Sequence, residues 1–385
     1  MNKTVILVPF SSSLINGCDY SLQTLAILGK KNYVYGVQLA EPYTWKSLLK
    51  DIFGKKCTLY STGDRYSIFR LPFLIPGQRF KKIEKANYLI GSLLLRVYFY
   101  FKHGSCQKIL WLFEPYQTIT FFKLFKSYFK LYDCVDYFQA TSSEVKQDEQ
   151  YILSHSDLVA LNSRTLQRLH GRINPHTILV PVGFPDAIFT PFSAQVKKFQ
   201  KKKRLIIGYI GGINDRLNFK LLRELVTLHP QDIFKFVGPM QVDNNVIEPE
   251  VLRQVELLKK MPNTQWIDNQ PKSAIPGIIL SMDICLIPYD IRNPFNRYCY
   301  PMKLLDYFFF QKPVISTAIE ELKYFPSVVM IGDSAADFSS HINDIRNNGW
   351  SATKGKYQQE VALSNTWEKK VTLICEAIEK RLKTS

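Results

Sequence analysis

Short apolar segments alternate with helical stretches along this chain of 385 residues. The first apolar segment, 4–9, leads into a serine-rich loop at 11–13 and then into a helical stretch at 20–29. A strand that is apolar throughout is buried on both faces, which is typical of a parallel sheet covered by helices. Further strands of this kind are predicted at 32–38, 108–113, 132–135, 158–161 and 177–180. The alternation predicts an α/β fold.

A polar segment with five lysines, 191–204, divides the pattern in two, and a second strand–turn–helix unit begins directly after it. Strands are predicted again at 205–210, 234–237, 264–267, 284–288 and 313–316. We therefore predict two tandem Rossmann-like domains facing a cleft, one over 1–190 and one over 204–363. The tail, 364–385, has helical periodicity, and we expect it to pack back on the N-terminal domain.

The charge of the chain indicates an anionic partner. Lys and Arg outnumber Asp and Glu by 50 to 33, which gives a formal net charge of +17. Nucleic acid, phosphorylated small molecules and an anionic membrane surface all fit this charge. The longest apolar run, 88–101, is shorter than the roughly 20 residues of a spanning helix and contains Arg96, so we expect a buried or interfacial helix.

The seven cysteines are scattered, with no C-x-x-C pair and no cluster with histidine at the spacing of metal ligands. We therefore expect no metal site. The first ten residues have the pattern of a strand and lack that of a secretion signal, which predicts reduced thiols and a cytoplasmic protein.

Two motifs have the chemistry of an anion site. The turn 208–216 places Gly211 and Gly212 between a strand and a helix, where glycine lets the backbone approach a ligand closely. An ordinary tight turn explains it equally well. In 296–307, Pro301 suits the first turn of a helix, and Lys303 and Asp306 share a helix face. The alternative there is a solvated ion pair.

From 204 to 317 the order of these parts resembles the donor domain of GT-B glycosyltransferases, in particular the family-four-like bacterial polysaccharide enzymes. The matching segments are IGYIGGINDRLNFKLL, FVGP, MPNTQWID and MDICLIPYDIRNPFNRYCYPMKLLDYFFFQKPVIST. YDCVDYF, SHSDLVALNS and ILVPVGFP resemble the end of the acceptor domain, while 1–130 match only in outline.

The resemblance implies transfer of a hexose-like sugar from a nucleotide diphosphate sugar, with a UDP-sugar favoured, to a saccharide or polyprenyl-linked acceptor in surface polysaccharide synthesis. It implies no cofactor and no catalytic metal. The residues expected around the donor nucleotide are Gly211, Gly212, Arg216, Arg297, Tyr300, Pro301, Met302, Lys303 and Asp306.

The chain departs from the family pattern at several positions. Tyr298 occupies the position of the first of two family glutamates, and Gly212 and Leu217 replace a basic pair, although Arg216 lies alongside. These changes leave a retaining or an inverting course open. An inverting enzyme needs a carboxylate base in the acceptor domain, and the candidates are Asp136, Glu114 and Asp19. Each is also explained as a capping or solvated acid.

The segment 117–132 predicts a basic amphipathic helix, with Lys123, Lys126 and Lys130 on one face. Such a helix suits an anionic interface and predicts peripheral association with the inner face of the cell membrane. The alternative is an ordinary Rossmann helix with its apolar side on the sheet.

Two other functions compete with glycosyl transfer. A nucleic-acid-binding protein would use the net charge and the aromatic residues, but no RRM or KH signature is present, so we expect no nucleic-acid partner. A catalytically inactive relative that only binds a sugar nucleotide would explain the missing glutamate and basic residues.

Overall fold

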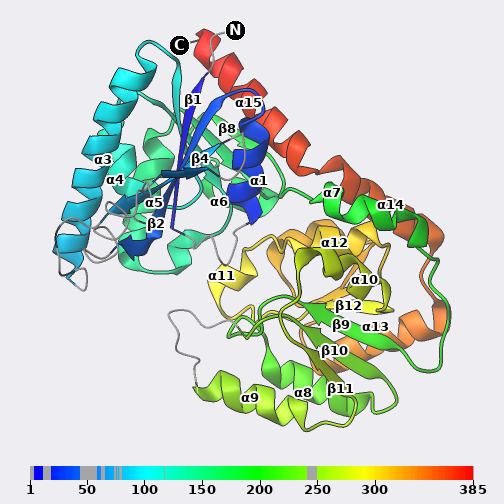
Figure 1. Ribbon diagram of the computed structural model, residues 1–385. Helices are drawn as coiled ribbons and strands as arrows, with labels where there is room; N and C mark the ends of the chain where they lie inside the picture. The colour runs from blue at the N-terminus through cyan, green and yellow to red at the C-terminus, as the bar shows by residue number, and fades with distance from the viewer. Residues whose placement is uncertain are drawn as a thin grey trace. The chain divides into compact units, whose positions relative to one another are not determined.

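The computed structural model describes residues 4–11, 19–43, 59–61, 66–72, 75, 77, 80–116, 118–240 and 249–384. The chain forms two compact units (Figure 1). The first unit contains Met1–Pro181 and Lys370–Ser385, and the second contains Val182–Lys369. The second unit therefore begins before the basic segment at which the sequence analysis placed the boundary. Each unit has a hydrophobic core of its own.

An eight-stranded sheet forms the centre of the first unit, in the order β3-β4-β2-β1-β5-β6-β7-β8. Its strands are parallel except for β3, which pairs antiparallel with β4. All six residues of β1 are buried, as expected for a strand covered on both faces. The strands are β1 Val5–Phe10, β2 Tyr33–Tyr43, β3 Leu59–Ser61, β4 Ser67–Pro72, β5 Lys108–Leu112, β6 Phe129–Cys134, β7 Leu158–Leu161 and β8 Thr177–Leu179.

The helices of the first unit cover this sheet. Serine hydroxyls cap two of them, because Ser142 accepts from the backbone N–H of Val145 at the start of α5 and Ser163 accepts from that of Leu166 at the start of α6. The helical segments are α1 Asp19–Leu28, α3 Lys81–His103, α4 Thr118–Leu124, η1 Phe138–Ala140, α5 Ser143–His155, α6 Arg164–His170 and the part of α15 from 370 onward.

The predicted basic amphipathic helix over 117–132 is wrong. In the described part of this segment, α4 ends at Leu124 and β6 begins at Phe129. Phe121 and Phe125 are fully buried in the core. The backbone N–H of Lys130 donates to Asp157 at 2.7 Å, and β6 pairs with β5 and β7. Pairing between two neighbouring strands therefore overrode the helical periodicity of the segment.

The second unit contains a six-stranded parallel sheet in the order β11-β10-β9-β12-β13-β14. This is the strand order of a Rossmann fold, in which the direction of winding reverses between the first and fourth strands, here β9 and β12. The strands are β9 Ile206–Ile210, β10 Ile233–Val237, β11 Thr264–Ile267, β12 Ile284–Ile287, β13 Val314–Ser316 and β14 Val329–Ile331.

The helices of the second unit alternate with these strands. Ser334 and Asp337 form a reciprocal capping box at the start of α13, and Asn218 caps α8. The helical segments are α7 Asp186–Phe189, η2 Thr190–Gln195, α8 Phe219–Leu228, α9 Pro249–Lys259, η4 Lys272–Ala274, α10 Ile275–Leu280, α11 Pro294–Arg297, α12 Lys303–Phe309, η5 Glu320–Tyr324, α13 Ala335–Asn348 and α14 Ala352–Ser364, followed by the first three residues of α15 Trp367–Thr384.

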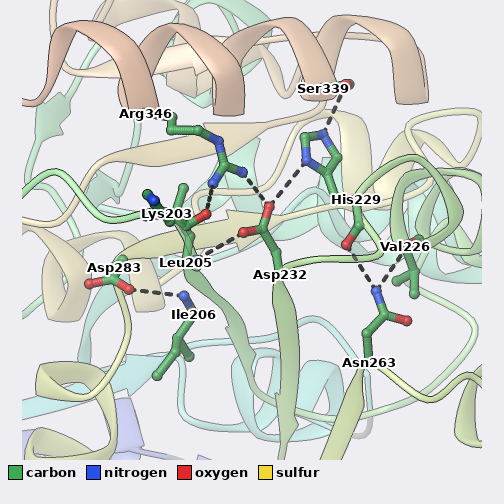
Figure 2. A network of polar contacts seen from close by, with 10 residues as sticks. All are labelled: Lys203, Leu205, Ile206, Val226, His229, Asp232, Asn263, Asp283, Ser339 and Arg346. Carbon is green, nitrogen blue, oxygen red and sulfur yellow. Dashed lines mark hydrogen bonds and ion pairs between the residues drawn. The ribbon is translucent and has the colours of Figure 1, made fainter.

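A buried polar network ties the amino ends of these strands to α13 (Figure 2). Asp232 is fully buried and accepts from the backbone N–H of Leu205 at 2.9 Å and from the guanidinium of Arg346. His229 Nδ1 lies 3.2 Å from Asp232 Oδ2, and its Nε2 lies 2.9 Å from Ser339 Oγ. The network lies at the sheet edge opposite to the carboxyl ends of the strands, where ligands bind in such folds, and so we assign it a structural role.

Candidate functional site

The carboxyl ends of β9 and β12 form the point of the second sheet where a ligand is expected. The turn after β9 begins at Gly211, whose φ of +142° is one that side-chain-bearing residues rarely adopt. Its N–H donates to the carbonyl of Val237 at 2.9 Å. Gly238, at the end of β10, has a φ of +140°, and a Cβ there would lie 2.1 Å from the Gly211 carbonyl oxygen. The two glycines therefore allow these turns to touch.

Lys303, at the start of α12, reaches back to this turn. Its Nζ donates to the hydroxyl of Tyr289 at 2.5 Å and to that of Tyr209 at 3.2 Å. Burial lowers the pKa of Lys303, but the two tyrosines raise it by more, so the net shift is upward and the ammonium stays charged at neutral pH. A Cβ on Gly211 would lie 2.8 Å from this Nζ. The ammonium is thus held against the glycine turn.

Asp306 lies one helical turn after Lys303 on α12 and is half-buried. Burial raises the pKa of its carboxyl to about 7, offset only in part by the charges of Lys303 and Lys272. Within the described residues the carboxyl makes no hydrogen bond. It therefore remains available to accept hydrogen bonds from the hydroxyls of a ligand.

The other residues predicted around the donor nucleotide lie in different surroundings. Arg216 joins the cluster, because its guanidinium lies 4.6 Å from the ring centre of Tyr289 and its Nε donates to the buried Asn296 at 2.8 Å. Arg297 instead forms an ion pair with Glu320, with Nε 3.3 Å from Oε1. The carbonyl of Gly212 accepts from the Tyr209 hydroxyl at 3.0 Å. Tyr300 and Pro301 are buried and Met302 is half-buried in the segment before α12.

Sequence reasoning missed Tyr209, Tyr289 and Lys272. The positions of the two tyrosines in the sequence could have indicated them. Tyr209 lies near the carboxyl end of β9, and Tyr289 lies just beyond the carboxyl end of β12. Ligands bind at the carboxyl ends of the strands in such sheets, so a tyrosine at a strand end is a candidate for the site. No comparable sequence signal marks Lys272. It belongs to the short η4 segment and approaches Asp306 only through the tertiary fold.

The candidate acids of the first unit lie at the carboxyl ends of β5 and β6. Glu114 is buried and accepts from the backbone N–H of Ser11, and its pKa is raised by burial, which that hydrogen bond opposes. Asp136 is half-buried. Burial raises the pKa of Tyr116, and the charges of Glu114 and Asp136 raise it further, which places both acids near this hydroxyl. The side chain of Asp19 lies outside the described part of the structure.

Three buried residues that the sequence did not bring together meet in the first unit. Cys134, Glu149 and His170 each offer a ligand atom, and these atoms lie within 4.8 Å of one another. This meeting in space is one that the spacing of cysteines and histidines along the sequence did not indicate. The three residues come from β6, α5 and α6, at separations that match no metal-binding motif.

No protein-family model matches the chain. Over 259 residues it is 24% identical to TuaH of Bacillus subtilis strain 168, whose name assigns it, as a candidate glycosyltransferase, to teichuronic acid biosynthesis. That match covers 62% of this chain and 63% of TuaH, less than two thirds of the relative.

Solved structures match over almost the whole chain. A sucrose-phosphate synthase from Thermosynechococcus elongatus superposes with a TM-score of 0.76 at 14% identity, covering 100% of both chains. HepE of Anabaena, in complex with UDP and glucose, superposes with a TM-score of 0.70 at 13% identity, covering 97% of this chain and 99% of HepE. The α/β fold of two Rossmann-like units is thus confirmed, and it is the fold of GT-B glycosyltransferases.

Proposed function

We propose that this protein is a glycosyltransferase that moves a sugar from a UDP-sugar to a saccharide or polyprenyl-linked acceptor in the synthesis of a surface polysaccharide. The observation that carries the proposal is the cluster of Lys303, Asp306 and Gly211 at the point where the winding of the second sheet reverses. The similarity to TuaH and the UDP bound by HepE support the donor class.

The donor would be held by charge and by hydroxyl recognition together. Lys303 presents a fixed ammonium beside Gly211, where the β-phosphate of a diphosphate would sit. Asp306 would accept hydrogen bonds from the ribose diol. A cation placed at the departing diphosphate stabilises the charge that develops there, so these residues would bind UDP and also favour bond cleavage without a metal ion at that position.

For an inverting course we propose Asp136 as the general base in the first unit. Asp136 is half-exposed, whereas Glu114 is buried and already accepts from Ser11. A base must reach both the acceptor hydroxyl and water, which favours the more accessible acid. Asp19 stays a third candidate. The course of the reaction, retaining or inverting, decides whether such a base is needed.

We further propose that α3, and not the segment 117–132, carries peripheral association with the inner face of the cell membrane. Seven large hydrophobic side chains of α3 are exposed: Leu89, Leu93, Leu94, Val97, Tyr98, Tyr100 and Phe101. Lys81 and Lys82 begin the helix and Lys102 lies in its last turn, a combination that suits an anionic interface. A lipid-linked acceptor would be reached from such a surface.

None of the helices in the described part of the chain is both long and apolar enough to span a bilayer.

The decisive experiment is calorimetry with UDP and with uridine. Lys303→Ala should weaken UDP binding at least about tenfold while leaving uridine binding nearly unchanged, because the lost hydrogen bond is charge-assisted and directed at phosphate. Lys260→Ala is the matched control, since Lys260 is an exposed lysine just after α9. Parental UDP affinity in folded Lys303→Ala would place the donor site elsewhere. UDP binding without turnover of any UDP-sugar would favour the inactive relative.

A further inference from the structure

A buried polar cluster in the first unit lies apart from every residue assigned to donor binding. Cys134 ends β6, Glu149 lies in α5 and His170 ends α6. Their exposed fractions are 0%, 0% and 2%. Figure 1 labels α5 and α6 within the first unit. The ligand atoms of the three residues lie within 4.8 Å of one another. Three elements of one domain therefore direct sulfur, oxygen and nitrogen atoms to one point.

The hydrogen bonds of this cluster are incomplete in the described structure. Oε1 of Glu149 accepts from the hydroxyl of Tyr132 at 2.7 Å and lies 3.7 Å from the Cys134 sulfur. Oε2 of Glu149 and Nε2 of His170 are buried without a partner. Burial raises the pKa of Glu149 to about 7, although Tyr132, Cys134 and both the side-chain and backbone amides of Gln139 act to lower it; Nε2 of Gln139 is itself buried without a partner in the described structure. Buried polar groups are normally satisfied, so a missing component would complete the site.

We propose that Cys134, Glu149 and His170 bind a structural zinc ion. Thiolate, imidazole and carboxylate are the zinc ligands of proteins, with metal–ligand distances of about 2.3 Å for sulfur and about 2.0–2.2 Å for nitrogen and oxygen. Around a tetrahedral ion such bonds place sulfur and oxygen about 3.5 Å apart. The observed 3.7 Å between Cys134 Sγ and Glu149 Oε1 is close to this value.

The surrounding groups suit a metal site as well. Tyr132 donates to the carboxylate of Glu149 and would fix its orientation, as outer partners of metal ligands do. Nε2 of His170 is buried without a hydrogen-bond partner in the described structure, and zinc takes the neutral ring as its ligand. On binding, the Cys134 thiol would release its proton to solvent, and a water molecule would take the fourth position. Sulfur and imidazole ligands disfavour magnesium and calcium.

The ion would link three elements beneath the loop that carries a candidate base. The Cys134 thiol donates to the backbone carbonyl of Asp136 at 3.5 Å. The metal-bound thiolate would give up this hydrogen bond, and the ion would instead fix Cys134 itself, two residues before Asp136. The site is buried and would not contact substrate, which makes its role structural. The zinc proposal does not depend on the proposed sugar transfer. If either zinc binding or sugar transfer is disproved, the other can still be tested.

The test measures zinc in the full-length protein, purified without a metal-affinity tag from zinc-supplemented cells. We expect about one zinc ion per chain in the parent and less than about 0.1 in Cys134→Ala and His170→Ala. Cys285→Ala is the control, because Cys285 is an equally buried thiol in the second unit. It should retain the parental zinc content.

A second measurement keeps the proposal testable if the variants fail to fold. The parent is stripped with a chelator and titrated with cobalt(II) chloride, which should give a thiolate-to-cobalt charge-transfer band at about one equivalent. Zinc should also raise the temperature of unfolding of the stripped protein. Parent protein that purifies without zinc and binds cobalt(II) without a thiolate band would overturn the proposal. Cys134 would then act as a hydrogen-bond donor to Asp136 and Glu149 and not as a metal ligand.

Discussion

The ammonium of Lys370 lies 2.9 Å from the carboxylate of Asp133, a residue 237 positions earlier in the chain. Both side chains are buried, with exposed fractions of 2% and 0%. Asp133 belongs to β6 and Lys370 to α15, so this ion pair fastens the C-terminal helix to the central sheet of the first unit. It explains how residues 370–385 become part of a unit built mainly from the first 181 residues.

Lys370→Met should destabilise the first unit. The substitution leaves the Asp133 carboxylate buried without its partner, and breaking a buried ion pair in this way costs about 3–5 kcal/mol. Denaturant unfolding followed by tryptophan fluorescence measures the change. Lys369→Met is the control, because Lys369 is exposed on the same helix. Equal unfolding midpoints for the two variants would show that the ion pair does not fasten the helix.

Binding of UDP should depend on pH through Asp306. Its pKa of about 7 means that the carboxyl is largely protonated below neutrality in the free protein. Ribose hydroxyls donate to the ionised form, so UDP affinity should rise as the pH increases from about 6 to about 8. Asp306→Asn should bind UDP at least about tenfold more weakly at pH 8 and lose this dependence. Calorimetry across that range is the measurement, and a pH profile unchanged in Asp306→Asn would contradict the assignment.

Tyr289→Phe should weaken UDP binding through Lys303. The substitution removes the hydroxyl that accepts from Nζ at 2.5 Å but keeps the ring that Arg216 contacts. A hydrogen bond to a charged group contributes about 1.5–3 kcal/mol, of which the second tyrosine hydroxyl retains part, so we expect a loss of about three- to tenfold. Uridine affinity should not change. Tyr357→Phe, at an exposed tyrosine of α14, is the control; equal UDP affinities in the two variants would exclude a positioning role.

The network around Asp232 should make the second unit acid-sensitive. Burial raises the pKa of Asp232, but hydrogen bonds from His229, Arg346 and the Leu205 N–H outweigh it, so the net shift is downward. A carboxyl whose pKa is lowered in the folded state contributes stability at a pH above its unfolded-state pKa of about 3.9. This stability is lost as the pH falls through the folded-state pKa. Thermal unfolding between about pH 5 and pH 3 should therefore shift more in the parent than in Asp232→Asn.

The exposed Asp268 provides the comparison for that experiment. Asp268→Asn should keep the full parental acid sensitivity, because this carboxyl lies outside the network in Figure 2. If Asp232→Asn and the parent lose the same stability on acidification, the acid sensitivity has another source.

Association with anionic vesicles should depend on the outward face of α3. Replacing Leu94, Val97 and Phe101 by serine removes apolar side chains that are 57%, 55% and 81% exposed. Each would contribute about 1 kcal/mol or more on entering the interface, so partitioning in a sedimentation assay should fall at least about tenfold. Folding should be unaffected. Leu228→Ser, at a leucine that is 52% exposed in the second unit, should leave partitioning unchanged. If the α3 variant and Leu228→Ser lose partitioning equally, α3 does not carry the association with vesicles.

Local sequence determined most of the strands. The predicted strands at 158–161 and 264–267 coincide with β7 and β11, and that at 205–210 begins one residue before β9. A buried parallel strand is a continuous apolar run, and this signal is contained within a few residues. The order of the motifs in the second unit likewise predicted the GT-B fold.

Tertiary structure alone decided which side chains meet. Lys303 contacts Tyr209 from 94 positions away, and Cys134, Glu149 and His170 converge from three elements. Strand order sets these contacts, and the separation of two residues along the sequence does not by itself fix that order. The raised pKa of Asp306 comes from burial, which exists only after packing. In 129–132, pairing with two neighbouring strands outweighed a helical pattern, because sheet hydrogen bonds and core burial exceed a local preference.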